Sequence, residues 1–596
     1  MTSSRRKESR FNPVHLVAYA LILLPVVLGF LFVRLFGVDI PFGDVWTMVP
    51  QFDKLSVGAL GFMDLWVLHW EHRVFFPRIV LLLVGVFADF DQVVVMYLIQ
   101  VLLLATLVVT LLAFKDDVGW KPFLFVPIPF LLFNLGQYFN LFNGLQIAFS
   151  LTLAFSVLAF YLLHVAVRRG FKIWAFAGAM VGGTVASFSL LSGLFVWPVG
   201  FLQLFVSPLV RRTKVILMAS WSLAGLVVWA AYFYGWSIPE RQAGSYFFDN
   251  PGLVPGFFLA ALGDPLAWWG GTALSLACGL LVLFLAAVSL FFVYRTGQVG
   301  EYSFWLALLA FSTLYLIFLT LGRAGGGVEA AMNSRYITFT ILAIVGIYGM
   351  LAKLSLERGS WVVTGSLVLL FALVLVGVPF SYVEGIEQGQ KLERVRTSEA
   401  VLLATYRSQS EEALNIANRR SEYVRKNAFV LCKLGYTVFS EPEAQAGNCL
   451  PPSFSSLSPA GAGTALYQVD KVAGVNPSKR GAPITVSASR DSLKVGGWAI
   501  DAANKELAGG VYIKIDDKRF PAFYGKQRKR VPRGLDVPLY QFPWFEATVP
   551  MSEIGPGKHE LSVVVVTSDG EKYYRPSQGI AFKVVEKRKN NKRASS

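Results

Sequence analysis

Long apolar stretches separated by short polar loops fill most of the first 380 residues. They comprise residues 15–36, 93–113, 122–135, 146–167, 173–190, 193–210, 215–234, 272–294, 303–321, 336–351 and 361–380. A helix needs about 20 apolar residues to cross the hydrocarbon core of a bilayer, and most of these stretches approach that length. The pattern predicts a polytopic α-helical membrane protein with about 11 transmembrane helices.

Charged residues are distributed unevenly between the two sides of these predicted helices. The loops on the N-terminal side contain 15 basic and 5 acidic residues. Loops rich in Lys and Arg remain in the cytoplasm, so we expect a cytoplasmic N-terminus and an external C-terminal region. These loops and a basic tail, residues 587–596, also explain the net charge of +16 without a nucleic-acid partner.

A mostly acidic segment follows the first predicted helix. Residues 37–73 hold five acidic and two basic side chains, together with His69 and His72. Residues 74–88 are apolar but too few for a full crossing, and a crossing there would invert every later loop. We therefore predict an interfacial helix on the outer leaflet, which Pro77 and Arg78 near its start favour. Residues 37–91 are thus a predicted external loop.

The pattern changes after residue 380, where the predicted transmembrane domain 1–380 ends. Residues 381–482 have a helical pattern followed by a linker rich in Pro, Ser, Gly and Ala. Residues 483–586 alternate with a period of two between turn sequences, which predicts an external antiparallel β-sandwich. Its aromatic side chains could stack on sugar rings or simply pack the core. Cys432 and Cys449 are expected to form a disulfide if this compartment is oxidising.

Two acidic residues of the external loop are candidate catalytic groups. Asp44, close to Trp46, could accept a proton from a substrate hydroxyl, or could instead cap a helix. Glu71 lies in the sequence Glu71-His72-Arg73 and is the second candidate. Asp89 and Asp91 form a D-x-D pattern that could bind a divalent metal, although capping of the next helix is the alternative.

Cationic and amide side chains recur at the same predicted depth. Arginine forms bidentate hydrogen bonds with phosphate, so we consider four arginines as phosphate ligands, while snorkelling to the membrane surface is the alternative. They are Arg73, Arg78, Arg323 and Arg335. Further candidate binding residues are Trp46, His72, Tyr336, Asn143 and Gln146. The two amides are included because buried amides at the end of a span need partners.

These motifs resemble those of bacterial type C membrane glycosyltransferases and of related glycosyltransferase-like membrane proteins. The resemblance covers roughly residues 10–380 and is carried by Asp44/Trp46, Glu71-His72-Arg73, Phe76-Pro77-Arg78, Asn143-Gly144-Leu145-Gln146, Gly193 with Trp197-Pro198, and Ser334-Arg335-Tyr336. It implies a polyprenyl-phosphate-linked sugar donor, a glycan, lipid or protein acceptor, and a location in the bacterial cytoplasmic membrane. It also implies a general base in the first external loop, a role that Asp44 fits best. No cofactor is certain, although a divalent metal is possible.

Two other functions fit parts of the same sequence. A transporter or flippase of lipid-linked saccharides would also need phosphate-binding arginines, but polar groups near mid-membrane and an internal repeat are expected of a carrier. A membrane scaffold that binds polysaccharide through the β-domain is the third possibility.

Overall fold

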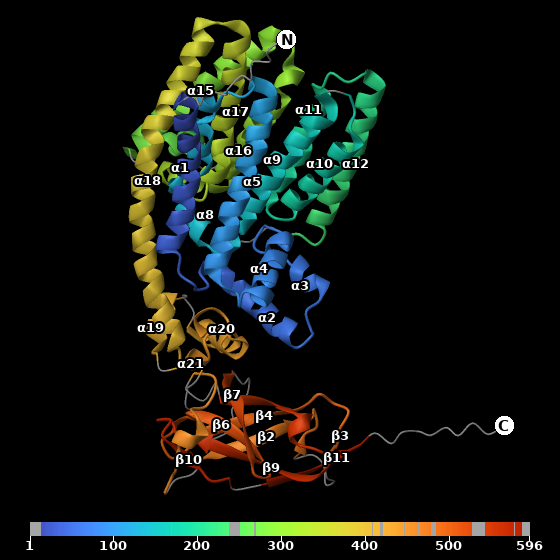
Figure 1. Cartoon of the computed structure of the whole chain (residues 1–596), viewed down its shortest axis with the longest axis vertical. Coiled ribbons are helices and arrows are strands. Elements are labelled where there is room, and N and C mark those ends of the chain that lie inside the picture. The colour runs from blue at the N-terminus through green and yellow to red at the C-terminus, as the bar shows by residue number, and fades with distance from the viewer. Residues whose placement is uncertain are drawn as a thin grey trace, which may run out of the picture. The chain divides into compact units, whose positions relative to one another are not determined.

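A computed structural model describes residues 13–168, 170–237, 251–267, 270–407, 409–417, 421–445, 448–461, 465–477, 484–526, 543–576 and 579–586. The chain divides into two compact units, Met1–Arg396 and Thr397–Ser596. The first is helical, and the second combines short helices with a β-sheet (Figure 1). The basic residues before residue 13 and the predicted basic tail, 587–596, lie outside the described residues.

Long apolar helices make up the first unit. They are α1 (Pro13–Phe36), α5 (Gln92–Val118), α9 (Ile147–Arg168), α12 (Arg211–Phe233), α15 (Gly271–Thr296), α16 (Ser303–Arg323), α17 (Ile337–Arg358) and α18 (Trp361–Ala404). Together with the broken segment Pro122–Phe142, the described part of the chain contains nine helices long and apolar enough to cross a membrane. This length and composition indicate a membrane protein.

Two of the eleven predicted crossings correspond to shorter helices. They are α10 (Ile173–Ser187) and the pair η4 (Leu191–Phe195) and α11 (Val196–Phe205). A further short apolar helix is α14 (Leu253–Ala267). The count of eleven therefore stays a prediction.

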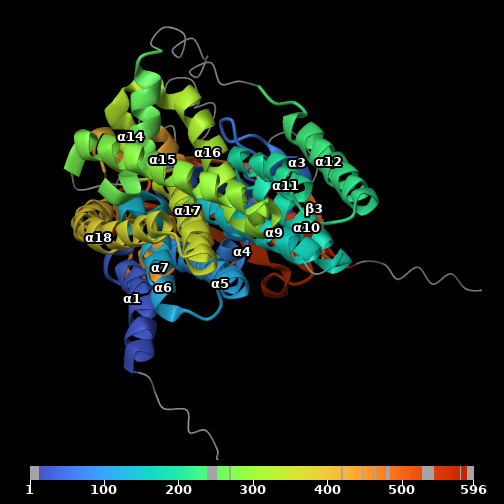
Figure 2. The ribbon, with the colours of Figure 1, turned by 90° about the horizontal axis from the view of Figure 1, so that it is seen from above.

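The helix α17 lies at the centre of the first unit, surrounded by other helices (Figure 2). Glycines allow its closest contact, which is with α16. A Cβ on Gly349 would lie 2.1 Å from the ring of Trp305, and one on Gly346 would lie 2.6 Å from the Trp305 carbonyl oxygen. Small residues at such a contact let two helix backbones approach, as is common in membrane bundles.

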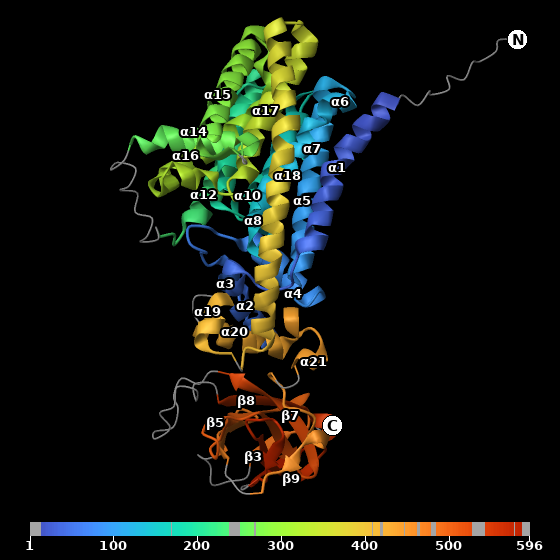
Figure 3. The same cartoon turned by 90° about the vertical axis from the view of Figure 1, so that its left-hand side faces the viewer.

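The predicted external loop folds into short helices at one end of this bundle (Figures 1 and 3). They are η1 (Gly43–Met48), α2 (Val49–Ser56), α3 (Phe62–Trp66) and α4 (Phe75–Phe87). The predicted interfacial helix is α4, which buries Leu81 but leaves Phe87 82% exposed. The segment between α5 and α9 runs from the opposite end of the bundle to this one and contains α6 (Pro122–Phe125), α7 (Pro127–Leu132), η2 (Leu135–Gln137), α8 (Tyr138–Phe142) and η3 (Gly144–Gln146) (Figure 3).

The predicted domain boundary at residue 380 falls inside α18, and the division between the units comes after Arg396 instead. The change from apolar to polar side chains after Phe380 does not end the helix, because residues 381–404 contain many good helix formers. Pro379 lies within the helix as well. The composition therefore changes near residue 380, but the helix continues to Ala404.

Short helices open the second unit and lead into a β-sheet. The helices are α19 (Glu411–Ala417), α20 (Ser421–Leu434), η10 (Thr437–Phe439), α21 (Pro442–Gln445) and η11 (Phe454–Ser456). The strands are β1 (Ser458–Pro459), β2 (Leu466–Val472), β3 (Ile484–Ser487), β4 (Ser492–Asp501), β5 (Glu506–Leu507), β6 (Gly510–Ile515), β7 (Lys518–Lys526), β8 (Trp544–Pro550), β9 (Gly557–Val566), β10 (Lys572–Tyr574) and β11 (Gly579–Val585).

The sheet differs from the predicted antiparallel sandwich in three ways. Its strands form one connected order, β1-β10-β9-β6-β7-β8-β4-β2, because β7 pairs with both β6 and β8. Two pairings are parallel, β1 with β10 and β3 with β11. The strand β2 also begins within the predicted linker, before residue 483. The strands enclose one apolar core that includes Val511, Tyr524 and Phe545.

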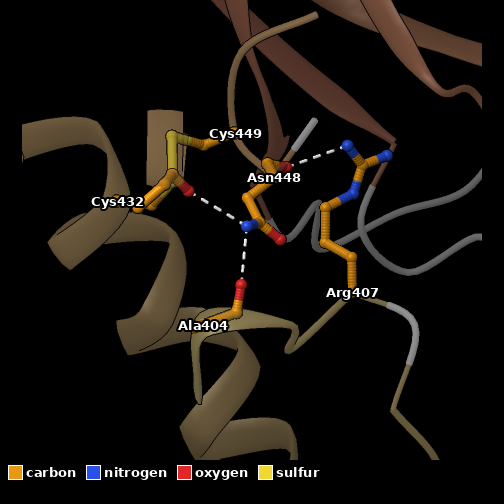
Figure 4. Close-up of a disulfide and its surroundings, with 6 residues drawn as sticks. Ala404, Arg407, Cys432, Asn448 and Cys449 are labelled. Atoms are coloured by element: carbon orange, nitrogen blue, oxygen red, sulfur yellow. Dashed lines mark hydrogen bonds between the residues drawn. A yellow bond between two sulfur atoms is a disulfide. The ribbon is translucent and has the colours of Figure 1, made fainter. Parts of the chain in front are cut away.

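A disulfide between Cys432 and Cys449 ties α20 to the start of the sheet, as the cysteine spacing predicts (Figure 4). The side-chain amide of Asn448 donates to the Ala404 carbonyl, at 2.6 Å, and the Asn448 carbonyl accepts from Arg407, at 2.8 Å. The Cys449 carbonyl accepts from the backbone N–H of Tyr524 in β7, at 2.8 Å. The bridge therefore lies in a hydrogen-bonded junction between helices and sheet.

Candidate functional site

The tight turn between α3 and α4 brings two histidines together. His69 and His72 exchange two backbone hydrogen bonds, of 2.8 and 2.9 Å, and Trp70 between them has a φ of 54°. Residues paired directly across an antiparallel bridge point their side chains to the same face. Each imidazole contacts one carboxylate, and we call Asp44, His69, Glu71, His72 and Arg323 the loop cluster.

Asp44 is the most accessible acid of the loop cluster. Its Oδ2 lies 3.5 Å from Nε2 of His69, and its side chain is 46% exposed. The His69 imidazole holds the pKa of the Asp44 carboxyl below its ordinary value against the opposing effect of burial, and Arg335 and His72 add to the lowering. Phe42, not Asp44, is the N-cap of η1. Asp44 is therefore a partly exposed carboxylate rather than a helix cap.

Glu71 is more enclosed than Asp44 and has two partners. Its Oε1 lies 3.5 Å from Nε2 of His72 and 3.5 Å from Nη2 of Arg323, at the end of α16. Burial lowers the pKa of His72 to about 4, so that imidazole is neutral at pH 7. Arg323 keeps 48% of its side chain exposed. It can therefore meet an anion from outside.

Arg335 lies beside the loop cluster, before the start of α17. Its guanidinium stacks on the ring of Phe139 at 5.1 Å, and its Nε donates to Oδ1 of Asn333 at 3.4 Å. Its charge contributes to the lowered pKa of Asp44, so the two groups are near each other. Tyr336, the N-cap of α17, follows it directly.

Arg73 and Arg78 are occupied by backbone carbonyls. The guanidinium of Arg73 donates to the carbonyls of Trp66, Tyr232 and Tyr234. That of Arg78 donates to the carbonyls of Leu65 and Val67. Both side chains are 3% exposed, so they stabilise the loop, and we omit them from the phosphate site proposed below. The sequence alone cannot separate them from Arg323, because all three are arginines beside predicted spans.

The remaining predicted residues surround the loop cluster in different ways. Trp46 is 1% exposed and contributes to the packed wall of η1. Asn143 is the N-cap of η3, where its Oδ1 accepts from the Leu145 N–H at 3.1 Å. Gln146 is 7% exposed at the end of η3. The two amides thus lie on an element that contacts η1.

The D-x-D pattern forms a strained turn and a helix cap. Asp89 and Phe90 have φ values of 48° and 59°, and Oδ1 of Asp91 accepts from the N–H groups of Val93 and Val94. Within the described ranges, no group of three or more His, Cys, Asp or Glu side chains could hold a metal ion. Capping therefore accounts for Asp91.

Asp39 is a titratable group that the sequence analysis did not single out. Its Oδ1 accepts from the backbone N–H of Gln92, at 2.8 Å, which fixes the chain after α1 to the start of α5. Burial raises its pKa to about 7, an effect that this hydrogen bond opposes and that Asp91 and Asp89 strengthen. His69 was likewise noted in the loop without a role. Only the fold brings it to Asp44.

An apolar groove of about 340 Å³ lies between α14, α15 and α16. Its lining residues are Val254, Pro255, Phe258, Leu259, Leu280, Leu283, Ile317, Thr320 and Leu321. The Thr320 hydroxyl donates to the Leu316 carbonyl, so it is already satisfied. Arg323 follows Thr320 by about one helical turn. One end of the groove is therefore close to a partly exposed cation.

A second group of charges lies at the other end of α5, about 40 Å along the helix from Gln92. Oδ1 of Asp117 lies 3.1 Å from Arg168, 3.6 Å from Lys353 and 3.7 Å from His164. Its Oδ2 accepts from the indole of Trp305 at 2.9 Å, and its side chain is fully buried. We call these five residues the Asp117 cluster.

No protein-family model matches the sequence, and a search of curated proteins likewise finds no match. The proposal for its function therefore depends on the chemistry of the residues described above.

Proposed function

We propose that this protein is a membrane glycosyltransferase. It transfers a sugar from a polyprenyl-phosphate donor to an envelope glycan, lipid or protein acceptor on the exoplasmic side of a bacterial cytoplasmic membrane. In this proposal the chain crosses the membrane eleven times, the N-terminus is cytoplasmic, and the second unit lies outside. The observation that carries the proposal is a loop cluster that holds a partly exposed carboxylate, Asp44, and a half-exposed cation, Arg323, which follows the groove residue Thr320 by about one helical turn.

Asp44 is the proposed general base. A base must be ionised and within reach of the substrate, and the lowered pKa and exposure of Asp44 meet both needs. It takes the proton of an acceptor hydroxyl while that oxygen bonds to the anomeric carbon. The bond from this carbon to the phosphate oxygen breaks, and the phosphate leaves with the electron pair. Direct displacement of this kind inverts the anomeric centre.

Arg323 and Arg335 are the proposed partners of the leaving phosphate. Negative charge increases on the phosphate as its bond to the sugar breaks, and guanidinium groups stabilise that charge. Arg323 must exchange its contact with Glu71 for the phosphate, which costs little because the pair is partly exposed. Glu71 stays the second candidate base, although its two partners make it less available.

The groove supports a lipid-linked donor. Its wall consists of carbon side chains and one satisfied hydroxyl, which suits a hydrocarbon chain and not a polar ligand. A chain in the groove would bring its phosphate towards Arg323. A soluble nucleotide sugar would leave the groove unused.

Replacement of Asp44 tests the proposal. In proteoliposomes with radiolabelled polyprenyl-phosphate sugars and an envelope fraction as acceptor, Asp44→Asn should lower kcat by about 10²- to 10⁴-fold. Binding of the lipid phosphate should remain, because the arginines are unchanged. The matched control is Asp53→Asn, an acid of the same loop on α2. Equal turnover by the two variants would remove Asp44 from the mechanism, and lipid movement across the vesicle without sugar transfer would indicate a carrier.

A further inference from the structure

Two side-chain amides near Asp44 carry buried oxygens with no partner. Oε1 of Gln92 and Oε1 of Gln146 accept no hydrogen bond from the described residues and are shielded from solvent. The two side chains are 1% and 7% exposed. The Gln92 amide nitrogen is satisfied, since it donates to the Phe90 carbonyl at 2.7 Å. Exchanging the positions of its oxygen and nitrogen would therefore place the oxygen against the Phe90 carbonyl and leave the nitrogen without an acceptor.

Two glycines bring the side-chain amides of Gln92 and Asn143 close to the residues that flank Asp44, and Gln146 ends the same short helix that Asn143 caps. A Cβ on Gly144 would lie 2.4 Å from Oε1 of Gln92 and 3.5 Å from Cγ2 of Val45, the residue after Asp44. A Cβ on Gly43, the residue before Asp44, would lie 3.5 Å from Nδ2 of Asn143. Gly43 at the start of η1 therefore lies against the Asn143 amide, and Gly144 of η3 lies between Val45 of η1 and the Gln92 amide of α5.

A buried acceptor without a donor is unfavourable, and native proteins contain few of them. A neutral amide oxygen can only accept a hydrogen bond. It repels a phosphate, whose oxygens are acceptors as well, and it attracts the hydroxyl groups of a sugar or another polyol. The two oxygens therefore select one chemical class of ligand, which is a group rich in hydroxyl donors.

We propose that Gln92 and Gln146, with Asn143, form a subsite beside Asp44 that recognises the ring hydroxyls of the sugar being transferred. This inference rests on the proposed function and assigns its polar specificity to named residues. The amide oxygens are closed off in this structure, so the sugar enters as η1 separates from η3. The glycines at positions 43 and 144 leave that contact without interlocking side chains.

The chain provides a matched control. Gln100 also lies on α5 with both amide atoms buried and unpartnered among the described residues. Its oxygen would lie 2.7 Å from a Cβ on Gly29, in contact with α1 and away from Asp44. Gln100 therefore also has a buried amide oxygen without a donor, but it lies against α1 and not near Asp44.

The experiment compares Gln146→Met and Gln92→Met with Gln100→Met, using a polyprenyl-phosphate hexose and its monodeoxy analogues as donors. Removing an unpaired buried acceptor should keep or raise the melting temperature in Gln146→Met and Gln100→Met. The two site variants should raise KM for the donor about tenfold for each lost hydrogen bond, with a smaller change in kcat. They should also lose discrimination against one deoxy analogue, whereas Gln100→Met should keep the wild-type KM and discrimination.

Unchanged KM and full discrimination in both site variants would overturn the inference while leaving Asp44-dependent transfer intact. If the wild-type protein transfers no sugar, the proposed function fails and the subsite is tested by binding. Free monosaccharides at millimolar concentration should then raise the melting temperature of the wild type and of Gln100→Met, but not of the site variants. Equal shifts in all four proteins would overturn the inference.

Discussion

The two ends of α5 hold charges in opposite ways. At one end, the Asp117 carboxylate is fully buried and lies within 3.7 Å of two cations, Arg168 and Lys353, of the His164 imidazole and of an indole donor. At the other end, Asp44 is nearly half exposed and meets one imidazole at 3.5 Å. A buried carboxylate that neutralises enclosed cations holds helices together, because it is costly to disturb. An exposed and weakly partnered one can exchange its contact for a substrate.

The largest effect on stability should come from neutralising the carboxylate of the Asp117 cluster. Asp117→Asn removes the buried carboxylate that Arg168 and Lys353 share and leaves them only the longer contacts with Glu301, at 3.9 Å, so it should lower the free energy of unfolding by about 3–5 kcal/mol. Thermal unfolding of the detergent-solubilised protein measures this. The control is Asp116→Asn, an exposed neighbour that only accepts from Tyr161, with an expected loss of about 1 kcal/mol. Similar losses in both variants would mean that the Asp117 cluster is not a clamp.

A change that depends on pH should come next, at Asp39 near the loop cluster. The folded-state pKa of about 7 exceeds the ordinary value of 3.8, so the folded protein holds a proton that the unfolded chain releases. Stability should therefore decrease as the pH rises from about 4 to 7 and remain reduced above it. Asp39→Asn removes this dependence and keeps an oxygen for the Gln92 N–H.

The measurement for Asp39 is thermal unfolding at pH 5 and at pH 8. At pH 8 the Asp39→Asn variant should exceed the wild type by up to about 4 kcal/mol, with a smaller difference at pH 5. A difference that is the same at both values would show that Asp39 does not titrate in this range. The end of α5 near Asp39 would then not be destabilised by a buried carboxylate at neutral pH.

The smallest effect should come from the ion pair within the loop cluster. Glu71→Gln should change the free energy of unfolding by less than about 1 kcal/mol, because Arg323 is half exposed and solvent screens the pair. High salt should remove even this difference, yet leave the effect of Asp117→Asn unchanged. Unfolding in low and high salt tests both statements. A Glu71→Gln variant as unstable as Asp117→Asn would contradict the distinction between the two ends.

The sequence predicted those features that depend on local pattern. Apolar length located the long helices, and cysteine spacing predicted the bridge between Cys432 and Cys449. The continuity of α18 through residue 380 was missed, because polarity and helix formation are separate properties. The double pairing of β7 was missed as well, since strand partners lie far apart in the sequence.

The candidate site was predicted only in part for the same reason. Asp44, Glu71 and Arg323 come together, although 252 residues separate Glu71 from Arg323. Arg73 and Arg78 matched the same motif, yet their donors are used by loop carbonyls that no pattern identifies. His69 and Gln92 gained significance only from contacts across elements.

The strand β7 joins the two groups of strands in the C-terminal sheet, so the sheet cannot be divided into two independent parts. It hydrogen-bonds to β6 through Val511–Ala522 and neighbouring pairs, and to β8 through Phe523–Glu546 and Tyr524–Phe545. A protease cut or an inserted tag within Lys518–Lys526 would disable both halves at once. Half-domains should therefore not be recoverable as separate soluble fragments, and a reporter would be better accommodated in the turn at Asp569-Gly570.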